Sequence, residues 1–151
     1  MTRRTLLALP FAMRLKADSA SDVWDLLAEA AHQLSEGDAP AFMNCFDPKM
    51  PGYEELRTDV EALVREAPPP AQSAATQRGG IYSSIDLVSD QGDDQTRSLE
   101  LDWILDIRRK EGSIGATRRQ ERVKVRAAKT GKKWRIVAFE PAGFFAPPDS
   151  R

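Results

Sequence analysis

The chemistry open to this 151-residue sequence depends on few side chains. The only histidine, His32, is the first candidate for a general base because the ordinary pKa of imidazole lies near neutrality. Helical spacing places it opposite the apolar stripe that begins at Val23, so we expect it to face solvent. The only cysteine, Cys45, lies beside Phe46, and no histidine is expected within reach to activate it. We expect a buried, unreactive thiol.

Two tyrosines and one aspartate are the remaining candidates, Tyr53, Tyr82 and Asp86. A phenol and a carboxyl group that converge in an apolar cavity can polarise a carbonyl group and move a proton, which is the chemistry of a small isomerase or dehydratase. However, Tyr82 and Asp86 alternate with Ile81 and Ile85, which predicts that the polar pair faces solvent. The sequence therefore assigns no catalytic residue.

Motifs for metal, nucleotide and acyl-transfer chemistry are absent from the sequence. It contains no phosphate-binding glycine loop, nucleophile elbow or zinc-binding helix motif. One histidine and one cysteine cannot supply the usual zinc ligands, and a single cysteine cannot form an internal disulfide. We expect neither a metal nor a cofactor. No apolar segment approaches the roughly 20 residues that a membrane-spanning helix needs.

Acidic and basic residues are segregated in the second half of the chain. Residues 86–106 contain seven acids and one arginine, a net charge of −6, whereas residues 108–135 contain twelve bases and two acids, a net charge of +10. The totals of 22 basic and 23 acidic residues nearly cancel, so no global field attracts nucleic acid. Surfaces that bind nucleic acid usually interleave aromatic residues with the bases, and none occurs between Trp103 and Trp134. We expect no nucleic acid partner.

The two charged segments are predicted to be neighbouring antiparallel strands. Placing apolar residues opposite one another pairs Trp103 with Val125 on one face. The other face then pairs Asp102 with Arg126 and should be held by such opposite charges. The same register pairs Asp106 with Arg122 and Leu105 with Val123. Five bases are left near the hairpin loop as a candidate patch for an anion or a partner: Arg108, Arg109, Lys110, Arg118 and Arg119.

Three helices are predicted in the first half. Apolar residues recur every three or four positions over 21–34 and again over 53–67, which is the period of an amphipathic helix. Between them, a short helix over 39–46 has Asp38 as its N-cap. Ser21 is the expected N-cap of the first helix.

Four antiparallel strands are predicted in the second half, over residues 81–89, about 97–108, about 120–128, and after a turn at 129–132. In the second strand large apolar residues alternate with acids, and we expect the apolar side to face the helices. Six residues on that side are expected to form either core or the wall of an apolar ligand pocket: Leu99, Leu101, Trp103, Leu105, Val123 and Val125.

The first 20 residues are predicted to be a basic and apolar leader. Arg3 and Arg4 precede a short apolar run, which resembles a twin-arginine export signal. Small residues at 17–19 are a candidate cleavage site. Alternatively, the segment is a disordered leader on a cytoplasmic protein, or translation starts at Met13. The sequence therefore leaves open whether the protein is exported or cytoplasmic. The sequence is therefore divided into a leader at 1–20, a domain at 21–148 and a tail at 149–151.

Four segments carry a resemblance to a known family: F-D-P-K-M-P-G-Y at 46–53, L-D-W at 101–103, K-W-R-I at 133–136 and F-F-A-P-P at 144–148. Together with the helical first half, they resemble the nuclear transport factor 2-like (SnoaL-like) superfamily, in particular small bacterial members that have no assigned activity. The resemblance implies an α+β fold, in which N-terminal helices pack on a curved, four-stranded antiparallel sheet to form a cone. It also implies a pocket in the cone and frequent dimerisation through the sheet, but no reaction.

Two functions follow as hypotheses. The first is a non-catalytic binding or assembly module that forms a homodimer through its sheet and holds a small apolar ligand in a hydrophobic pocket. The second is a small enzyme of isomerase or dehydratase type that uses Tyr53 or Tyr82 as a donor and Asp86 as a base.

Overall fold

The computed structural model describes residues 2–68, 80–108 and 116–148, with side chains from Ser19 onward in the first helix and from Thr117 onward in the third strand. Within these ranges, three helices precede four strands: α1 (Thr2–Ser35), α2 (Ala39–Met43), α3 (Tyr53–Glu66), β1 (Gly80–Gly92), β2 (Thr96–Arg108), β3 (Ala116–Thr130) and β4 (Lys133–Glu140). Helices followed by strands are typical of an α+β domain, as the sequence predicts.

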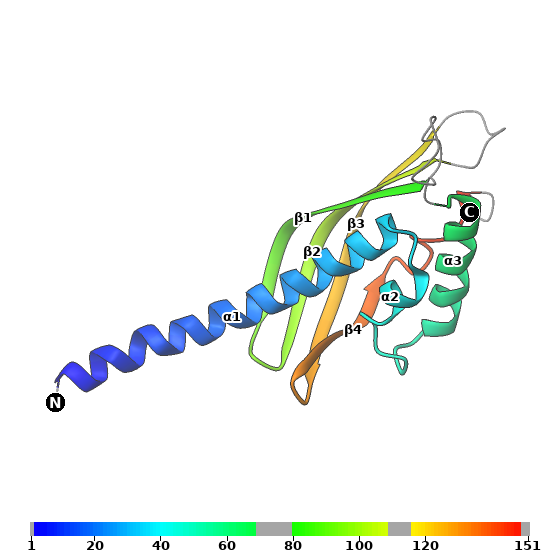
Figure 1. Ribbon diagram of the computed structural model, residues 1–151. Coiled ribbons are helices and arrows are strands. Elements are labelled where there is room, and N and C mark those ends of the chain that lie inside the picture. Colours follow the sequence, from blue (N-terminus) through cyan, green and yellow to red (C-terminus); the bar gives the residue numbers. More distant parts are fainter. Residues whose placement is uncertain (1, 69–79, 109–115, 149–151) are drawn as a thin grey trace.

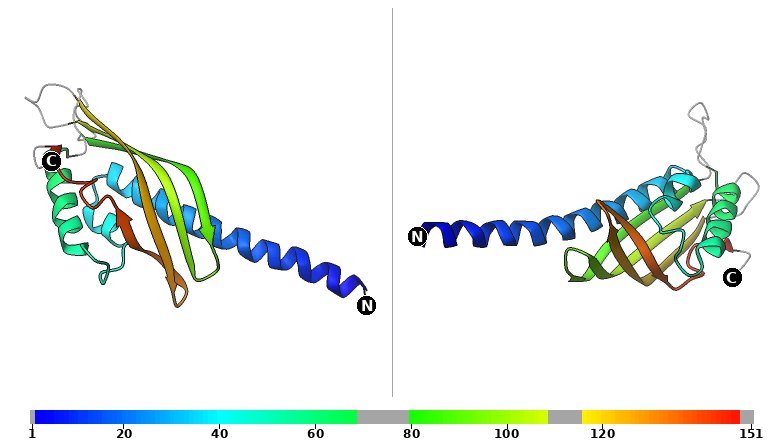
Figure 2. Two further views of the ribbon diagram at one scale, coloured as in Figure 1. Left: turned by 180° about the vertical axis from the view of Figure 1, so that it is seen from behind. Right: turned by 90° about the horizontal axis from the view of Figure 1, so that it is seen from below.

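The four strands form one antiparallel sheet in the order β1-β2-β3-β4. The sheet is twisted, and the three helices lie on one of its faces (Figure 1). Helix α1 crosses that face beside β1, while α2 and α3 lie toward β4, and the view from behind shows the opposite face bare of helices (Figure 2). We call the helix-covered side the inner face, which carries the odd positions 99–107 of β2, and the opposite side the outer face, which carries the even positions 98–106.

Strand β2 separates apolar from acidic side chains, as its alternation predicts. All five odd positions, from Leu99 to Ile107, are at most 2 % exposed, and the even positions are more accessible. Burying one such side chain stabilises the fold by about 1.5–3 kcal/mol. The predicted burial of the Trp103 segment against the helices is thus confirmed.

Helix α1 begins earlier than the sequence predicts. It is continuous from Thr2, so Ser21 is an exposed residue in its interior and not an N-cap. No glycine occurs in residues 2–35, although Pro10 lies inside the helix, where it lacks a backbone donor and its ring crowds the preceding turn. Its end is as the sequence predicts, since Gly37 takes the left-handed conformation (φ 75°) that ends many helices.

The predicted register of β2 and β3 is wrong by four residues. Trp103 lies opposite Glu121 rather than Val125, and Asp102 lies opposite Arg122 rather than Arg126. By the same shift Asp106 lies opposite Arg118 rather than Arg122, and Leu105 opposite Arg119 rather than Val123. An even shift leaves every side chain on its predicted face. The prediction failed because it placed large apolar residues of the two strands opposite one another. In the structure the strands pair as far as Arg108 and Ala116, so the hairpin loop is shorter than the predicted register requires.

A chain of hydrogen bonds joins α1 to the sheet. The Trp103 indole Nε1–H donates to Ser83 Oγ at 2.8 Å, and the Ser83 backbone N–H donates to Ser35 Oγ at 3.1 Å. Ser35 Oγ in turn donates to the Ala31 carbonyl of α1 at 3.2 Å. The buried indole N–H is therefore satisfied, and the orientation of Trp103 is fixed relative to the helix.

Candidate functional site

The interior of the cone is the first place where a ligand is expected. All six predicted lining residues lie on the inner face, and each is at most 2 % exposed. Side chains this inaccessible are packed core rather than the wall of an open cavity. Of the two alternatives that the sequence leaves open for them, the structure supports core.

Aromatic rings fill the interior beside Trp103. Phe145 has its ring centroid 5.2 Å from Trp103, 5.1 Å from Phe139 and 5.1 Å from Phe42. Its neighbour Phe144 is also fully buried, with its centroid 6.3 Å from Trp103. Several of these contacts are edge-to-face or tilted, which adds about 0.5–1.5 kcal/mol per pair to the area effect. The segment after β4 therefore packs into the cone and becomes part of its core.

Arg119 was predicted to belong to an exposed basic patch, and this is wrong. Its side chain is 7 % exposed and lies on the inner face of β3, where its guanidinium donates a hydrogen bond to the backbone carbonyl of Phe144. The physical reason is the period of the strand, because Arg119 has the same parity as the buried Val123 and Val125. Arg119 holds the backbone of the aromatic segment in place.

The rest of the predicted basic patch is only partly described. Arg108 is exposed at the end of β2, and its guanidinium carbon lies 4.8 Å from the ring centroid of Tyr82, a cation–π contact. Arg118 is exposed on β3 opposite Asp106. Arg109 and Lys110 lie outside the described residues.

The three candidate catalytic residues do not converge. Tyr82 is 49 % exposed on β1, and Asp86 is exposed four residues further along the same strand, about 13 Å away at the rise of a strand. Both lie on the outer face. Tyr53 begins α3 and packs against the core on the inner side. The sheet therefore separates Tyr53 from the other two.

His32 and Cys45 are both placed as predicted. The His32 side chain is exposed, with Nε2 3.8 Å from Glu36 of the next helical turn. Cys45 is buried, and this burial raises the pKa of its thiol to about 11, with the charge of Glu29 adding to the effect and that of Lys133 opposing it. A thiol with this pKa is protonated near neutral pH and is a poor nucleophile.

The outer face is the other candidate site, and it carries two adjoining rows of opposite charge. Arg122 binds Asp102 through two hydrogen bonds, Nε to Oδ1 at 2.8 Å and Nη2 to Oδ2 at 3.3 Å. These bonds hold the pKa of Asp102 below its ordinary value. Further along the sheet Lys124 lies between Glu100 of β2 and Glu140 of β4. A shallow hollow of about 360 Å³ opens here, and its lining includes Ser98, Glu100, Lys124, Arg126, Ala138 and Glu140.

Two features are absent from the described residues. No cluster of three or more His, Cys, Asp or Glu side chains there is arranged to hold a metal ion. None of the described helices combines the length and the apolar character needed to cross a bilayer.

Comparison with known proteins gives matches only at the level of the fold. No protein-family model matches the sequence, and no curated protein does. A conserved protein from Planctomyces limnophilus has a similar structure, with a TM-score of 0.68 at 7 % identity over 82 % of this chain and 94 % of that one. A protein from Novosphingobium aromaticivorans, whose proposed activity is that of a scytalone dehydratase, gives 0.64 at 8 % identity over 92 % and 85 %. A nuclear transport factor 2-like protein of unknown function from Shewanella oneidensis gives 0.54 at 12 % identity over 80 % and 95 %.

The chain has the nuclear transport factor 2-like fold. The resemblance in its sequence motifs is therefore confirmed for the architecture, including the cone of helices on a curved sheet. Within this nuclear transport factor 2-like domain, the motif F-F-A-P-P contributes two core rings, Phe144 and Phe145. In the sequence these rings are predicted only as part of a family motif and not as core. The signal was present, because two adjacent large aromatic residues are rarely left in water.

Proposed function

We propose that this chain is a non-catalytic assembly module that forms a homodimer through the outer face of its sheet. The observation that carries the proposal is the pair of charge rows on that face, acidic on β2 and basic on β3, which none of the described helices covers. Within one chain the two rows lie side by side and pair with each other, as Arg122 does with Asp102. The paired side chains remain partly exposed to solvent, so they are also accessible to a partner.

A two-fold axis suits this pattern of charge. A symmetric dimer brings the same patch of both copies together, so the patch must be complementary to itself. If the axis passes between β2 and β3, the acidic row of one copy faces the basic row of the other. Asp102, for example, is then able to contact both Arg122 of its own chain and the equivalent arginine of the partner. The hollow beside Lys124 leaves room for side chains of the second copy.

The composition of the outer face sets the expected strength of the dimer. Its side chains are mostly charged, and Ile104 is half-buried among them. Each solvent-exposed charge pair contributes little binding free energy and is screened by salt. We therefore expect a dimer that forms at micromolar concentration and weakens as the salt concentration rises.

Sedimentation velocity at micromolar concentration tests this proposal with a charge-swap series. Arg122→Glu places a like charge opposite Asp102 and is expected to give monomers. The double variant Asp102→Arg/Arg122→Asp restores opposite charges and is expected to restore the dimer. Arg57→Glu, on the exposed surface of α3, is the control and should leave the dimer intact. A wild-type protein that stays monomeric, or a dimer that survives Arg122→Glu, contradicts the proposal.

The ligand and the enzyme hypotheses receive less support from the geometry. A small apolar ligand needs space beside Trp103, where the described side chains are packed as core. An isomerase or dehydratase needs a tyrosine and an aspartate in one cavity, whereas Tyr53 lies across the sheet from Asp86. The dehydratase activity proposed for one protein of similar fold is not carried over at 8 % identity.

A further inference from the structure

The hollow on the outer face is formed by two neighbouring rows of residues that run across the strands. The first row, from β1 to β4, consists of Ser89, Glu100, Lys124 and Glu140. The next row toward the turn between β1 and β2 consists of Gln91, Ser98, Arg126 and Ala138. Both rows line the hollow, which therefore spans all four strands and is centred on β2 and β3.

Two β-bulges lie beside the hollow. Val88 is an extra residue in β1, and Val137 is an extra residue in β4. A bulge bends its strand and increases the local twist of the sheet. Ser98 and Ala138, which are both short, lie on either side of Arg126 in the second row. The hollow is therefore a feature of the backbone and of the small side chains beside Arg126.

The two bases in the hollow differ in how well acids balance them. Lys124 has Glu100 directly opposite on β2 and Glu140 directly opposite on β4. Arg126 is exposed and has neutral residues in those places, and in the described part of the chain it forms neither a hydrogen bond nor an ion pair. Side chains directly opposite one another are closer than diagonal neighbours, so the two acids act mainly on Lys124. Arg126 therefore has N–H donors available to a ligand.

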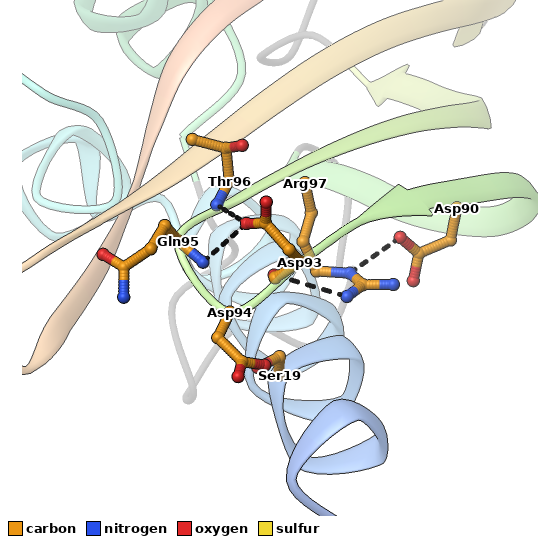
Figure 3. A network of polar contacts seen from close by, with 7 residues as sticks. All are labelled: Ser19, Asp90, Asp93, Asp94, Gln95, Thr96 and Arg97. Atoms are coloured by element: carbon orange, nitrogen blue, oxygen red, sulfur yellow. Dashed lines mark hydrogen bonds and ion pairs between the residues drawn. The ribbon is translucent and has the colours of Figure 1, made fainter. Parts of the chain in front are cut away.

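The acids of the turn between β1 and β2, at the same end of the sheet, are engaged elsewhere. Asp90 pairs with Arg97 at 2.9 Å (Figure 3). Asp94 accepts a hydrogen bond from the Ser19 hydroxyl of α1 at 2.7 Å (Figure 3). Asp93 accepts two backbone N–H groups of its own turn. These three carboxylates therefore have partners other than the bases of the hollow.

The proposed dimer encloses this hollow. A two-fold axis that runs along the strands between β2 and β3 keeps each residue at the same level, so the hollow of one copy faces the hollow of the other. One hollow measures about 360 Å³, and two together fall within the roughly 300–1,000 Å³ of typical small-molecule sites. Arg126 of both copies then borders one cavity. Enclosure also excludes water, which strengthens the attraction between a guanidinium group and an anion.

We propose that this cavity binds a small dicarboxylate, with one carboxylate on Arg126 of each copy. The inference rests on the dimer of the proposed function. A guanidinium group presents a planar fork of N–H donors that matches the two oxygens of a carboxylate. The two-fold axis makes the two arginines equivalent, so a ligand with two equal anionic ends satisfies both. A monocarboxylate leaves one of them without a partner.

The remaining lining is compatible with such a ligand. Ser98 and Gln91 supply a hydroxyl and an amide group, which donate hydrogen bonds to carboxylate oxygens. Glu100 and Glu140 repel an anion, but Lys124 lies between them and opposes their charge. We therefore place the ligand at the row of Arg126 and not at the row of Lys124.

Sedimentation velocity in succinate tests this inference, with sodium chloride of equal ionic strength as the reference. At about ten times its own dissociation constant, a ligand that binds only the dimer lowers the Kd of dimerisation by about tenfold, and we expect this from succinate. Acetate and inorganic phosphate, each with a single anionic group, should have little effect beyond that of chloride. Isothermal titration calorimetry should give one succinate per two chains.

Two variants locate the site. Arg126→Gln keeps the pair of Asp102 and Arg122 and should still form dimers, but its dimerisation should no longer respond to succinate. Lys132→Gln removes the same charge from the exposed turn between β3 and β4, outside the hollow, and should respond as the wild-type protein does.

The outcomes separate a failure of the site from a failure of the dimer. A dimer with the same Kd in succinate and in chloride overturns the inference and leaves the dimer standing. A full response in Arg126→Gln, or an equal response to phosphate, also overturns it, because the effect then comes from another site or from charge alone. A protein that stays monomeric with and without succinate contradicts the proposed function, and the site with it.

Discussion

The two faces of the sheet are built from the same strands and differ in almost every physical property. On the inner face of β2 the side chains are apolar, inaccessible and closely packed around Trp103. On the outer face, one residue away along the chain, they are charged and accessible, and they pair across strands, as Asp102 does with Arg122. Stability therefore comes from the odd positions of β2, and any function in assembly comes from the even ones.

The two faces also differ in the space that they offer to a ligand or substrate. Phe144 and Phe145 occupy the interior of the cone beside Trp103, and Arg119 anchors their backbone. The outer face has charge but no enclosed space, and an open surface in water gives weak electrostatic effects. Among the described residues, the sheet separates Tyr53 from Tyr82 and Asp86, so these three candidates do not meet on either face.

The largest expected effect comes from the centre of the inner face. Trp103→Ala removes a buried ring and its hydrogen bond to Ser83, and we expect it to lower the free energy of unfolding by about 3–5 kcal/mol. Ile104→Ala, the adjacent residue on the outer face, should cost about 1 kcal/mol. Urea denaturation monitored by circular dichroism measures both. Equal losses for the two variants would remove the distinction between the faces.

A smaller effect is expected at the anchor of the aromatic segment. Arg119→Met keeps the volume of the side chain but leaves the buried Phe144 carbonyl without this donor, which should cost about 1–3 kcal/mol. Arg118→Met, on the outer face of the same strand, is the matched control and should change the free energy of unfolding by less than about 0.5 kcal/mol. A loss at Arg118 as large as that at Arg119 contradicts the assignment of faces on β3.

The smallest effect is a dependence on pH that separates the inner side from the outer. Burial raises the pKa of Cys45 to about 11, from an ordinary value of 9.0, so the folded state holds its proton more tightly than the unfolded state. The stability that this contributes is fully present below pH 9 and is lost as the pH rises toward 11. In Cys45→Ala the free energy of unfolding should therefore fall less between these pH values. An identical alkaline decline in both proteins would show that Cys45 is not desolvated.

The acid side of the same experiment concerns the outer face. The hydrogen bonds with Arg122 hold the pKa of Asp102 below its ordinary value in the folded state. Asp102 therefore stabilises the fold at pH values above its unfolded pKa, and this stabilisation is lost as the pH falls through its folded pKa. Because the pair is exposed, we expect Asp102→Asn to change the free energy of unfolding at acid pH much less than Cys45→Ala changes it at alkaline pH.

The sequence predicted the architecture well because the hydrophobic pattern determines it. Alternation in β2 and the helical stripes were enough to place the faces, and Gly37 marked the end of α1. The register between β2 and β3 could not be predicted in the same way, because a shift of four residues leaves every side chain on the same face of the sheet. The two registers differ only in the length of the hairpin loop, which the hydrophobic pattern does not specify.

The site was predicted less completely, for reasons that lie in tertiary contacts. Arg119 was assigned to the surface because it lies among other bases near the hairpin loop, although its parity with Val123 and Val125 places it on the inner face. Its partner, the Phe144 carbonyl, comes from a distant segment that no local pattern indicates. The aromatic filling of the cone depends on the path of the chain after β4, which includes a cis bond before Pro141. That path has no periodic signal in the sequence.

The central claim, that the outer face is where two copies of the chain meet, is tested most directly by carboxylate footprinting at increasing protein concentration. We predict that modification of Glu100 and Asp106 on β2 decreases as the concentration rises through the micromolar range, while Glu54 and Glu55 on the exposed side of α3 react equally throughout. Unchanged reactivity at Glu100 and Asp106 in a protein that sediments as a dimer would place the interface elsewhere and contradict the account.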